Sequence, residues 1–193
     1  MPDGILTYRE ITRDEVAQSA QIVLDAFNQL SEQSGSPKTE DAQPIIARLS
    51  EYLDDQGIPG HLYGGFVDGV QVGFFMLRQL GMDEETWELS MLSVSPAHQG
   101  KGYGRRLLSC SLQKVLDLKG VLAVCAVTDG NDRMLGMLAR EGFVCEASGV
   151  PVGPDLSIWM LRKDMKNASC ASDSCGSCSS GCDSCAGCSD ESL

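Results

Sequence analysis

The sequence predicts an α/β protein with a mixed sheet and helices packed against it. Two observations carry that prediction. Apolar residues switch repeatedly between helical spacing and period-two spacing, and a glycine-rich turn joins a strand to a helix near the middle of the chain. The chain has 193 residues, of which 42% are hydrophobic, and this suits one domain with a sizeable core and a short tail.

The first half of the chain is expected to form a strand, two helices and a hairpin. Thr12-x-x-Glu15 matches a capping box, and the residues after it carry apolar side chains at helical spacing. Asp68-Gly69 lies between alternating apolar residues, which is typical of a tight hairpin turn. The elements expected here are strands at residues 5–11, 61–67 and 70–80 and helices at residues 16–30 and 41–53.

The strand expected at Thr86–Val94 changes phase along its length. Leu89 and Met91 share one face, whereas Leu92 and Val94 continue the alternation on the other. A period-two pattern shifts in this way when one extra residue is inserted, so the sequence predicts a β-bulge near Met91 and Leu92.

The second half is expected to add a helix, a strand, a shorter helix and two strands. Residues 121–127 are continuously apolar, which is typical of a central strand covered on both faces. Asn131 can cap the shorter helix and Gly142 can end it, and a loop is expected at residues 150–154. The expected ranges are 103–118 and 131–140 for the helices and 121–127, 143–147 and 156–162 for the strands.

The turn after the bulged strand has the composition of an anion site. Its sequence, Gln99-Gly100-Lys101-Gly102-Tyr103-Gly104, fits Q-x-x-G-x-G and is followed by Arg105 and Arg106. Glycines let a ligand approach the backbone, the first helical N–H groups lack partners, and the helix dipole favours negative charge. These features favour a diphosphate. The spacing fits neither a P-loop nor a dinucleotide fingerprint.

The bulged strand and the glycine-rich turn together resemble the GCN5-related N-acetyltransferases (GNAT). Leu92, Val94 and Pro96 fit L-x-V-x-P, and residues 131–143 fit the family's closing segment N-x(10)-G-F. The resemblance spans residues 5–163 and implies the GNAT fold, a mostly antiparallel mixed sheet with a bulged, splayed strand and flanking helices. It also implies an acyltransferase that moves an acetyl group from acetyl-CoA to a primary amine directly, in a ternary complex.

The resemblance implies roles for the turn and the strand. The backbone amides of the turn would hold the diphosphate, the strand edge would pair with the pantetheine arm, and an N–H beside the bulge would stabilise the oxyanion. Asn131 would contact the cofactor, although its N-cap role alone also explains it. The cofactor-binding residues implied are Leu92, Ser93, Val94, Gln99, Gly100, Lys101, Gly102, Tyr103, Gly104, Arg105 and Asn131.

The acceptor amine, with an ordinary pKa near 10.4, is mostly protonated at neutral pH and needs a general base before it can attack. Glu88 is the candidate for this base. It lies six residues before Val94, where histone-acetyltransferase-like members carry a glutamate, and a solvated strand glutamate is the alternative. Many family members also carry a tyrosine as general acid where this chain has Leu138. Three alternatives follow from the missing tyrosine. The CoA thiolate can leave without a general acid, another group can protonate it, or the domain can bind CoA with little catalysis.

Six of the nine cysteines lie in a tail rich in Ser and Gly, so we expect an acetyltransferase domain at residues 1–165 and a disordered tail at residues 166–193. A metallothionein-like cluster for zinc or another soft metal, a redox-sensitive tail and a tail modified by another enzyme all stay open. The candidate metal ligands are Cys170, Cys175, Cys178, Cys182, Cys185 and Cys188.

The charge and hydropathy of the chain exclude some partners. A formal net charge of −12 argues against nucleic acid, because phosphate binding relies on Lys and Arg. No apolar run reaches the ~20 residues of a membrane span, and no signal pattern begins the chain, so a cytoplasmic protein is expected. The acceptor stays open between a small-molecule amine and a peptide or protein amine, and edge strands allow a homodimer. The alternative function is a CoA-binding, weakly or non-catalytic protein that responds to metal or redox state through its tail.

Overall fold

The computed structural model describes residues 5–35, 38–54, 60–80, 85–153 and 156–166. Its strands are β1 (Leu6–Glu10), β2 (Gly60–Val67), β3 (Val70–Gln79), β4 (Thr86–Val94), β5 (Leu122–Thr128), β6 (Val144–Gly153) and β7 (Leu156–Asp164). They form one sheet in the order β1-β2-β3-β4-β5-β7-β6, in which β4 and β5 are parallel and all other neighbours are antiparallel. The predicted α/β class with a mixed, mostly antiparallel sheet is confirmed.

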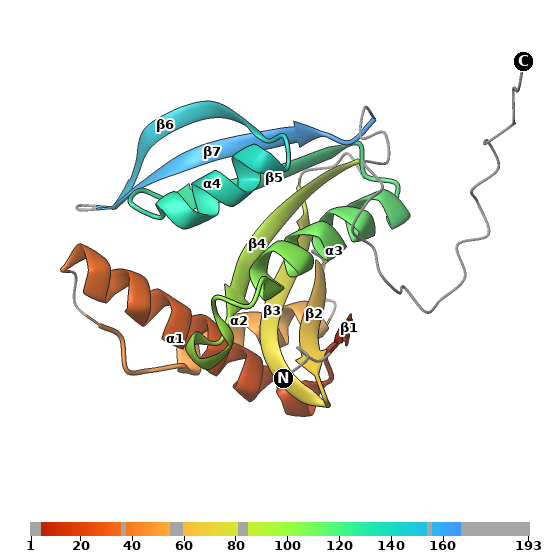
Figure 1. Ribbon diagram of the computed structural model, residues 1–193, viewed down its shortest axis with the longest axis vertical. Helices are drawn as coiled ribbons and strands as arrows, with labels where there is room; N and C mark the ends of the chain where they lie inside the picture. The colour runs from red at the N-terminus through yellow and green to blue at the C-terminus, as the bar shows by residue number, and fades with distance from the viewer. Residues whose placement is uncertain (1–4, 36–37, 55–59, 81–84, 154–155, 167–193) are drawn as a thin grey trace, which may run out of the picture.

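Helices cover the two faces of this sheet unequally. They are α1 (Val16–Ser34), α2 (Gln43–Leu53), α3 (Tyr103–Asp117) and α4 (Asp132–Arg140), with 3-10 turns η1 (Arg13–Glu15) and η2 (Pro96–His98). α3 packs on one face of β3 and β4, α1 and α2 pack on the opposite face, and α4 lies on the α3 side near β5 and β7 (Figure 1). None of the described helices is long and apolar enough to span a bilayer.

The two faces of the sheet bury separate apolar clusters. On the α3 side, Phe75 and Leu107 belong to one cluster, and both are fully buried. On the α1–α2 side, Phe74 and Val23 belong to the other and are likewise fully buried. Phe74 and Phe75 are adjacent in β3, so the alternation of the strand sends one ring to each cluster.

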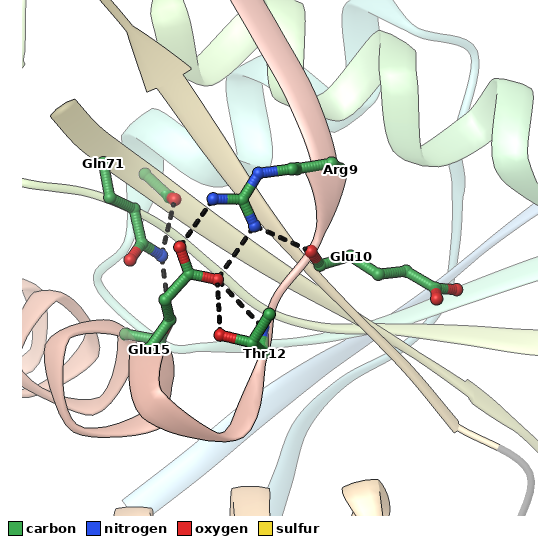
Figure 2. A network of polar contacts seen from close by, with 7 residues as sticks. Arg9, Glu10, Thr12, Glu15 and Gln71 are labelled. Carbon is green, nitrogen blue, oxygen red and sulfur yellow. Dashed lines mark hydrogen bonds and ion pairs between the residues drawn. The ribbon is translucent and has the colours of Figure 1, made fainter. Parts of the chain in front are cut away.

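The capping box predicted at the first helical segment forms, and Figure 2 shows its contacts. The Glu15 carboxylate accepts a hydrogen bond from the Thr12 backbone N–H at 2.9 Å. It also accepts hydrogen bonds from Nη1 and Nη2 of Arg9 at 2.8 and 2.6 Å. Ile11 and Val16, on either side of the box, are buried in the same cluster, as a hydrophobic staple requires. The box therefore fixes the direction in which the chain leaves β1.

The hairpin predicted between β2 and β3 is also confirmed. Asp68 and Gly69 have φ of 50° and 80°, the two positive values that a type I′ turn demands. The strand that follows runs back along the whole length of β2, with pairs from Gly60–Arg78 to Val67–Val70.

The expected loop at residues 150–154 is wrong, because β6 continues to Gly153. β6 is the outermost strand and pairs only with β7, with three register shifts along its length. Pro151 fits there since an edge strand can leave one backbone position without a ladder hydrogen bond.

The expectation that β5 is covered on both faces is also wrong. Its odd-numbered residues are buried in the α3-side cluster, whereas Ala126 is exposed and Val124 only half-buried. The cause is the placement of α1 and α2, whose described residues pack on β2, β3 and β4 rather than on β5 (Figure 1). The α1–α2 face of β5 is consequently open to a ligand.

Candidate active site

A β-bulge occurs in β4 at the position predicted from the sequence. Ser90 pairs with Met76 and Ser93 pairs with Phe74, so two residues of β4 oppose a single residue of β3. Met91, one of these two, has a φ of 54°, a left-handed conformation that non-glycine residues rarely adopt. The bulge bends the strand and turns its end away from the line of the sheet.

β4 and β5 are joined at one end and separate toward the other (Figure 1). They pair only from Thr86–Leu122 to Glu88–Val124. Beyond that point, residues 89–94 pair with β3 on one side and with no other described strand on the second side. Leu92, Ser93 and Val94 therefore lie where the predicted pantetheine edge requires them, on a strand with a free edge.

The glycine-rich turn leaves a row of backbone N–H groups without partners. Gly100 and Gly102 both have a φ of 79°, and Gly102 caps α3 with no side-chain hydrogen bond. Among the described residues, no backbone or side-chain acceptor receives a hydrogen bond from the amides of residues 100–105. Such a row at a helix N-terminus favours a bound anion.

Positive charge surrounds this row of amides. The exposed side chains of Lys101, Arg105 and Arg106 lie within it or directly after it, and Arg105 approaches Glu141 at 3.8 Å. Tyr103 contributes only backbone to the turn, because its side chain is buried. The turn thus offers both amide donors and charge complementarity to a diphosphate.

Gln99 differs from the other predicted turn residues. Its N–H already donates to the Pro96 carbonyl at 3.3 Å. Its side-chain amide donates to Gln29 of α1 at 2.7 Å and to the Val94 carbonyl at 3.2 Å, and its side-chain oxygen accepts from Arg133 of α4 at 3.1 Å. The motif glutamine therefore ties α1 and α4 to the end of β4, and no local sequence signal pointed to Gln29 or Arg133.

Asn131 and Leu138 have structural roles in and around α4. The Asn131 side chain caps the helix by accepting a hydrogen bond from the Met134 N–H at 3.2 Å, so its contact with a cofactor stays a prediction. Leu138, at the position of the family's tyrosine, is fully buried in the α3-side cluster.

Glu88 is a paired, largely buried glutamate and not a solvated one. It precedes the point where β4 and β5 separate, and its carboxylate accepts a hydrogen bond from Arg78 Nε at 2.7 Å and a second from Nη2. Only 16% of its side chain is exposed. Sequence reasoning missed Arg78, although the antiparallel register of β3 and β4 places it directly opposite Glu88.

The cysteines of the described chain differ in exposure. Cys125, in β5 beside Glu88, is buried, and burial together with the Glu88 charge raises the pKa of its thiol to about 12. The spacing of Cys110, Cys125 and Cys145 in helix and strand patterns predicts three buried thiols, but Cys110 is half-buried and Cys145 is exposed, so this prediction holds for Cys125 alone.

The predicted metal ligands in the tail all lie outside the described residues. Within those residues, no group of three or more His, Cys, Asp or Glu side chains is arranged to hold a metal ion. The tail's metal content stays a prediction.

Comparison with solved structures supports the fold. The Vibrio cholerae spermidine N-acetyltransferase, solved with CoA and spermine, matches with a TM-score of 0.66 and 16% identity, over 83% of this chain and 96% of that one. The yncA protein of Salmonella typhimurium, solved with acetyl-CoA, matches with a TM-score of 0.63 and 22% identity, over 89% and 99%. At these identities the likeness concerns the fold alone.

Comparison of sequences identifies the family. Mycothiol acetyltransferase of Propionibacterium freudenreichii is 30% identical over 156 residues, which are 80% of this chain and 47% of the relative. N-alpha-acetyltransferase RimI of Mycobacterium tuberculosis is 33% identical over 85 residues, 43% of this chain and 51% of the relative. The chain thus spans about half the length of these curated relatives. The model of the Acetyltransferase (GNAT) family matches residues 24–143, and the chain therefore belongs to that family.

Proposed function

We propose that this protein is an N-acetyltransferase that moves the acetyl group of acetyl-CoA to a primary amine in a ternary complex. The observation that carries the proposal is the free edge of β4 followed directly by the unpartnered amides of residues 100–105. An extended, amide-rich arm that ends in a diphosphate complements both features at once.

The cofactor residues follow from this arrangement. The edge at Leu92, Ser93 and Val94 pairs with the pantetheine arm, and the amides after Gln99 hold the diphosphate. Lys101 and Arg105 add positive charge. Asn131 lies at the start of α4 and is the remaining predicted contact.

Direct transfer is supported by the protonation state of the Cys125 thiol in β5. A covalent acetyl-enzyme needs a thiolate, and with a pKa of about 12 Cys125 is almost wholly protonated at neutral pH. It is also buried on the α3 side, away from the open face of β5. The acetyl group therefore passes from the thioester to the amine without a stop on this residue.

The transfer needs a base more than an acid. Glu88 accepts one proton from the ammonium form of the amine, so that the neutral nitrogen can attack the thioester carbonyl. The second proton of the nitrogen goes to the CoA sulfur as the C–S bond breaks. The departing CoA thiolate is a good leaving group, since thiols have a pKa near 8.5. Leu138, buried in the core, plays no part in its protonation.

The acceptor is a primary amine, and both a small molecule and a peptide or protein remain candidates for the molecule that carries it. The names of the relatives and of the structural neighbour, which refer to mycothiol, to N-alpha-acetylation and to spermidine, indicate no common acceptor scaffold. Cytoplasmic location, a homodimer and the boundary near residue 165 stay predictions from the sequence.

Acetyl-CoA titration and a thiol-release assay on the full-length protein test the proposal. We expect micromolar acetyl-CoA binding, turnover of at least one amine from a panel with spermidine and free-N-terminus octapeptides, and intersecting double-reciprocal lines. Parallel lines would indicate a covalent intermediate instead. No acetyl-CoA binding would refute the proposed function.

The tail provides a control for the alternative function. Replacing the six tail cysteines by serine should leave acetyl-CoA binding and turnover unchanged, with or without added zinc. If acetyl-CoA binding requires zinc in the native protein and is lost in the serine variant, a metal-responsive CoA-binding protein is favoured over the enzyme.

A further inference from the structure

The ion pair between Arg78 and Glu88 is asymmetric. Arg78 Nε donates to Glu88 Oε2 at 2.7 Å, and Arg78 Nη2 donates to the same oxygen. Oε1 accepts no hydrogen bond from the described residues. A guanidinium commonly binds a carboxylate with one donor on each oxygen, so the usual fork arrangement is absent from this pair.

This asymmetry leaves one oxygen anchored and the other available. Oε2 is held by two charge-assisted hydrogen bonds, which fix the orientation of the carboxylate. Oε1 keeps its lone pairs and can accept a proton from an amine or from a water molecule. A general base needs such an oxygen in a fixed position near the reacting nitrogen.

Arg78 is itself held in place from α2. Its guanidinium hydrogen-bonds the Tyr52 side chain, and the Arg48 guanidinium lies 5.9 Å from the centre of the Tyr52 ring. The ring packs tightly on Gly60, where a Cβ would come within 2.6 Å of it. The position of Glu88 is thus determined by packing that extends from α2 through β2 and β3.

The other groups around Glu88 do not compete with Arg78 for it. Tyr52 on α2 is bonded to Arg78, and Cys125 on β5 is a protonated thiol. On the same face, two strands away, Arg162 pairs with Glu146 at 2.8 Å. In the described chain, Arg78 is the cation bonded to Glu88.

We propose that Arg78 is a positioning residue for the acyl transfer, which anchors Oε2 of Glu88 so that Oε1 serves as the proton acceptor. The inference rests on the proposed function. The ammonium form of the amine loses one proton to Oε1, directly or through one water, and the neutral nitrogen then bonds to the acetyl carbon. The C–S bond breaks, its electron pair leaves on the CoA sulfur, and that sulfur takes the second proton of the nitrogen. Arg78 touches neither substrate and acts only through Glu88.

Four variants of the full-length protein test the inference, with acetyl-CoA and whichever amine of the panel turns over fastest. Arg78→Gln removes the anchor, Arg78→Lys keeps a cation but loses the planar pair of donors to Oε2, and Glu88→Gln removes the base. Arg162→Gln removes an exposed ion pair on the same face and is the matched control. Each is measured for acetyl-CoA Kd, for kcat and for the pH dependence of kcat/KM.

We expect Arg78→Gln to lower kcat at least 10-fold, because the carboxylate without its anchor no longer holds Oε1 in one position. Arg78→Lys keeps a cation beside Oε2 and should lower kcat less, by several-fold. Acetyl-CoA Kd should stay within about twofold in both. Arg162→Gln should change none of these quantities.

The double variant Arg78→Gln/Glu88→Gln separates positioning from general loss of structure. If Arg78 acts only through Glu88, the double variant has the kcat of Glu88→Gln alone. Additive losses would overturn the inference, as would an unchanged kcat in Arg78→Gln while Glu88→Gln is impaired, and in either case the proposed function would stand. Loss of acetyl-CoA binding in the native protein would overturn both.

Discussion

Gly102 sets the conformation that leaves the turn amides open, and its replacement by alanine has a predictable cost. Its φ is 79°, and a Cβ at this position would meet nothing within 4 Å. The substitution is therefore opposed by backbone strain alone, which is roughly 1–2 kcal/mol for a non-glycine residue in the left-handed region. If acetyl-CoA binding requires this conformation, Gly102→Ala should weaken binding about fivefold to thirtyfold.

Calorimetric titration with acetyl-CoA and thermal unfolding measure the two consequences separately. Gly149→Ala is the matched control, because Gly149 also has a positive φ, 65°, and open space around its Cβ, but lies in the outermost strand β6. If the turn relaxes in free Gly102→Ala, the strain opposes binding rather than folding, so this variant should lose affinity with little loss of stability. Gly149→Ala should keep its affinity. Gly102→Asn should recover part of the affinity, since asparagine tolerates the left-handed region.

The result that would refute this reasoning is a Gly102→Ala variant that keeps the stability of the native protein, so that its turn has relaxed, yet binds acetyl-CoA as tightly as the native protein. The orientation of the turn amides would then be unimportant for binding. The proposed diphosphate site would have to lie elsewhere.

Three further predictions concern contacts near the site and at the start of α1. Hydrogen bonds from Arg9 and Thr12 hold the pKa of the Glu15 carboxyl at about 2, below its ordinary 4.5. The stabilisation from these hydrogen bonds is complete above pH 4.5 and is lost as the pH falls toward 2. Glu15→Gln should therefore lower the free energy of unfolding in urea by about 0.5–1 kcal/mol at pH 7 and leave it unchanged at pH 2. Gly136→Ala, inside α4 with open space around the new Cβ, should raise the free energy of unfolding by about 1 kcal/mol, and a decrease would contradict the open space seen there. Gln99→Ala breaks three side-chain hydrogen bonds and should weaken acetyl-CoA binding several-fold, whereas an unchanged Kd would make its junction structural only.

The parts of the fold that local chemistry dictates could be predicted from the sequence. The hairpin at Asp68-Gly69 followed from a dipeptide that tolerates positive φ, and the capping box followed from Thr12 and Glu15. The bulge at Met91 was visible as a phase shift because the alternation of a strand cannot change without an extra residue.

The errors concern features that depend on neighbours in space. The apolar run of β5 suggested cover on both faces, but periodicity does not reveal how far α1 and α2 extend across the sheet. The helical spacing of Val16, Val23 and Phe27 also predicts that all three face the core, yet Phe27 is 47% exposed. Pro151 suggested a loop, whereas an outermost strand accommodates it.

The candidate site likewise has one part that the local sequence predicts and another part that depends on neighbours in space. The bulge, the free strand edge and the open amides all lie within residues 89–105, so one continuous pattern carries them and the family can be identified from it. The contacts that hold the turn in place and orient Glu88 come from distant parts of the chain. Gln99 meets Gln29 across 70 residues, and Glu88 is oriented by Arg78, which α2 holds in turn.

This division has a consequence for specificity. A change in the cofactor half alters the contiguous pattern of residues 89–105. A change in α1, α2 or β5 alters the open face around Glu88 while leaving that motif intact. The acceptor should therefore be changeable by substitutions on the α1–α2 side, such as at exposed Ala126, with acetyl-CoA affinity preserved. An Ala126→Phe variant that loses amine turnover and keeps its acetyl-CoA Kd would place the amine on that face, and a variant with unchanged KM for the amine would remove it from there.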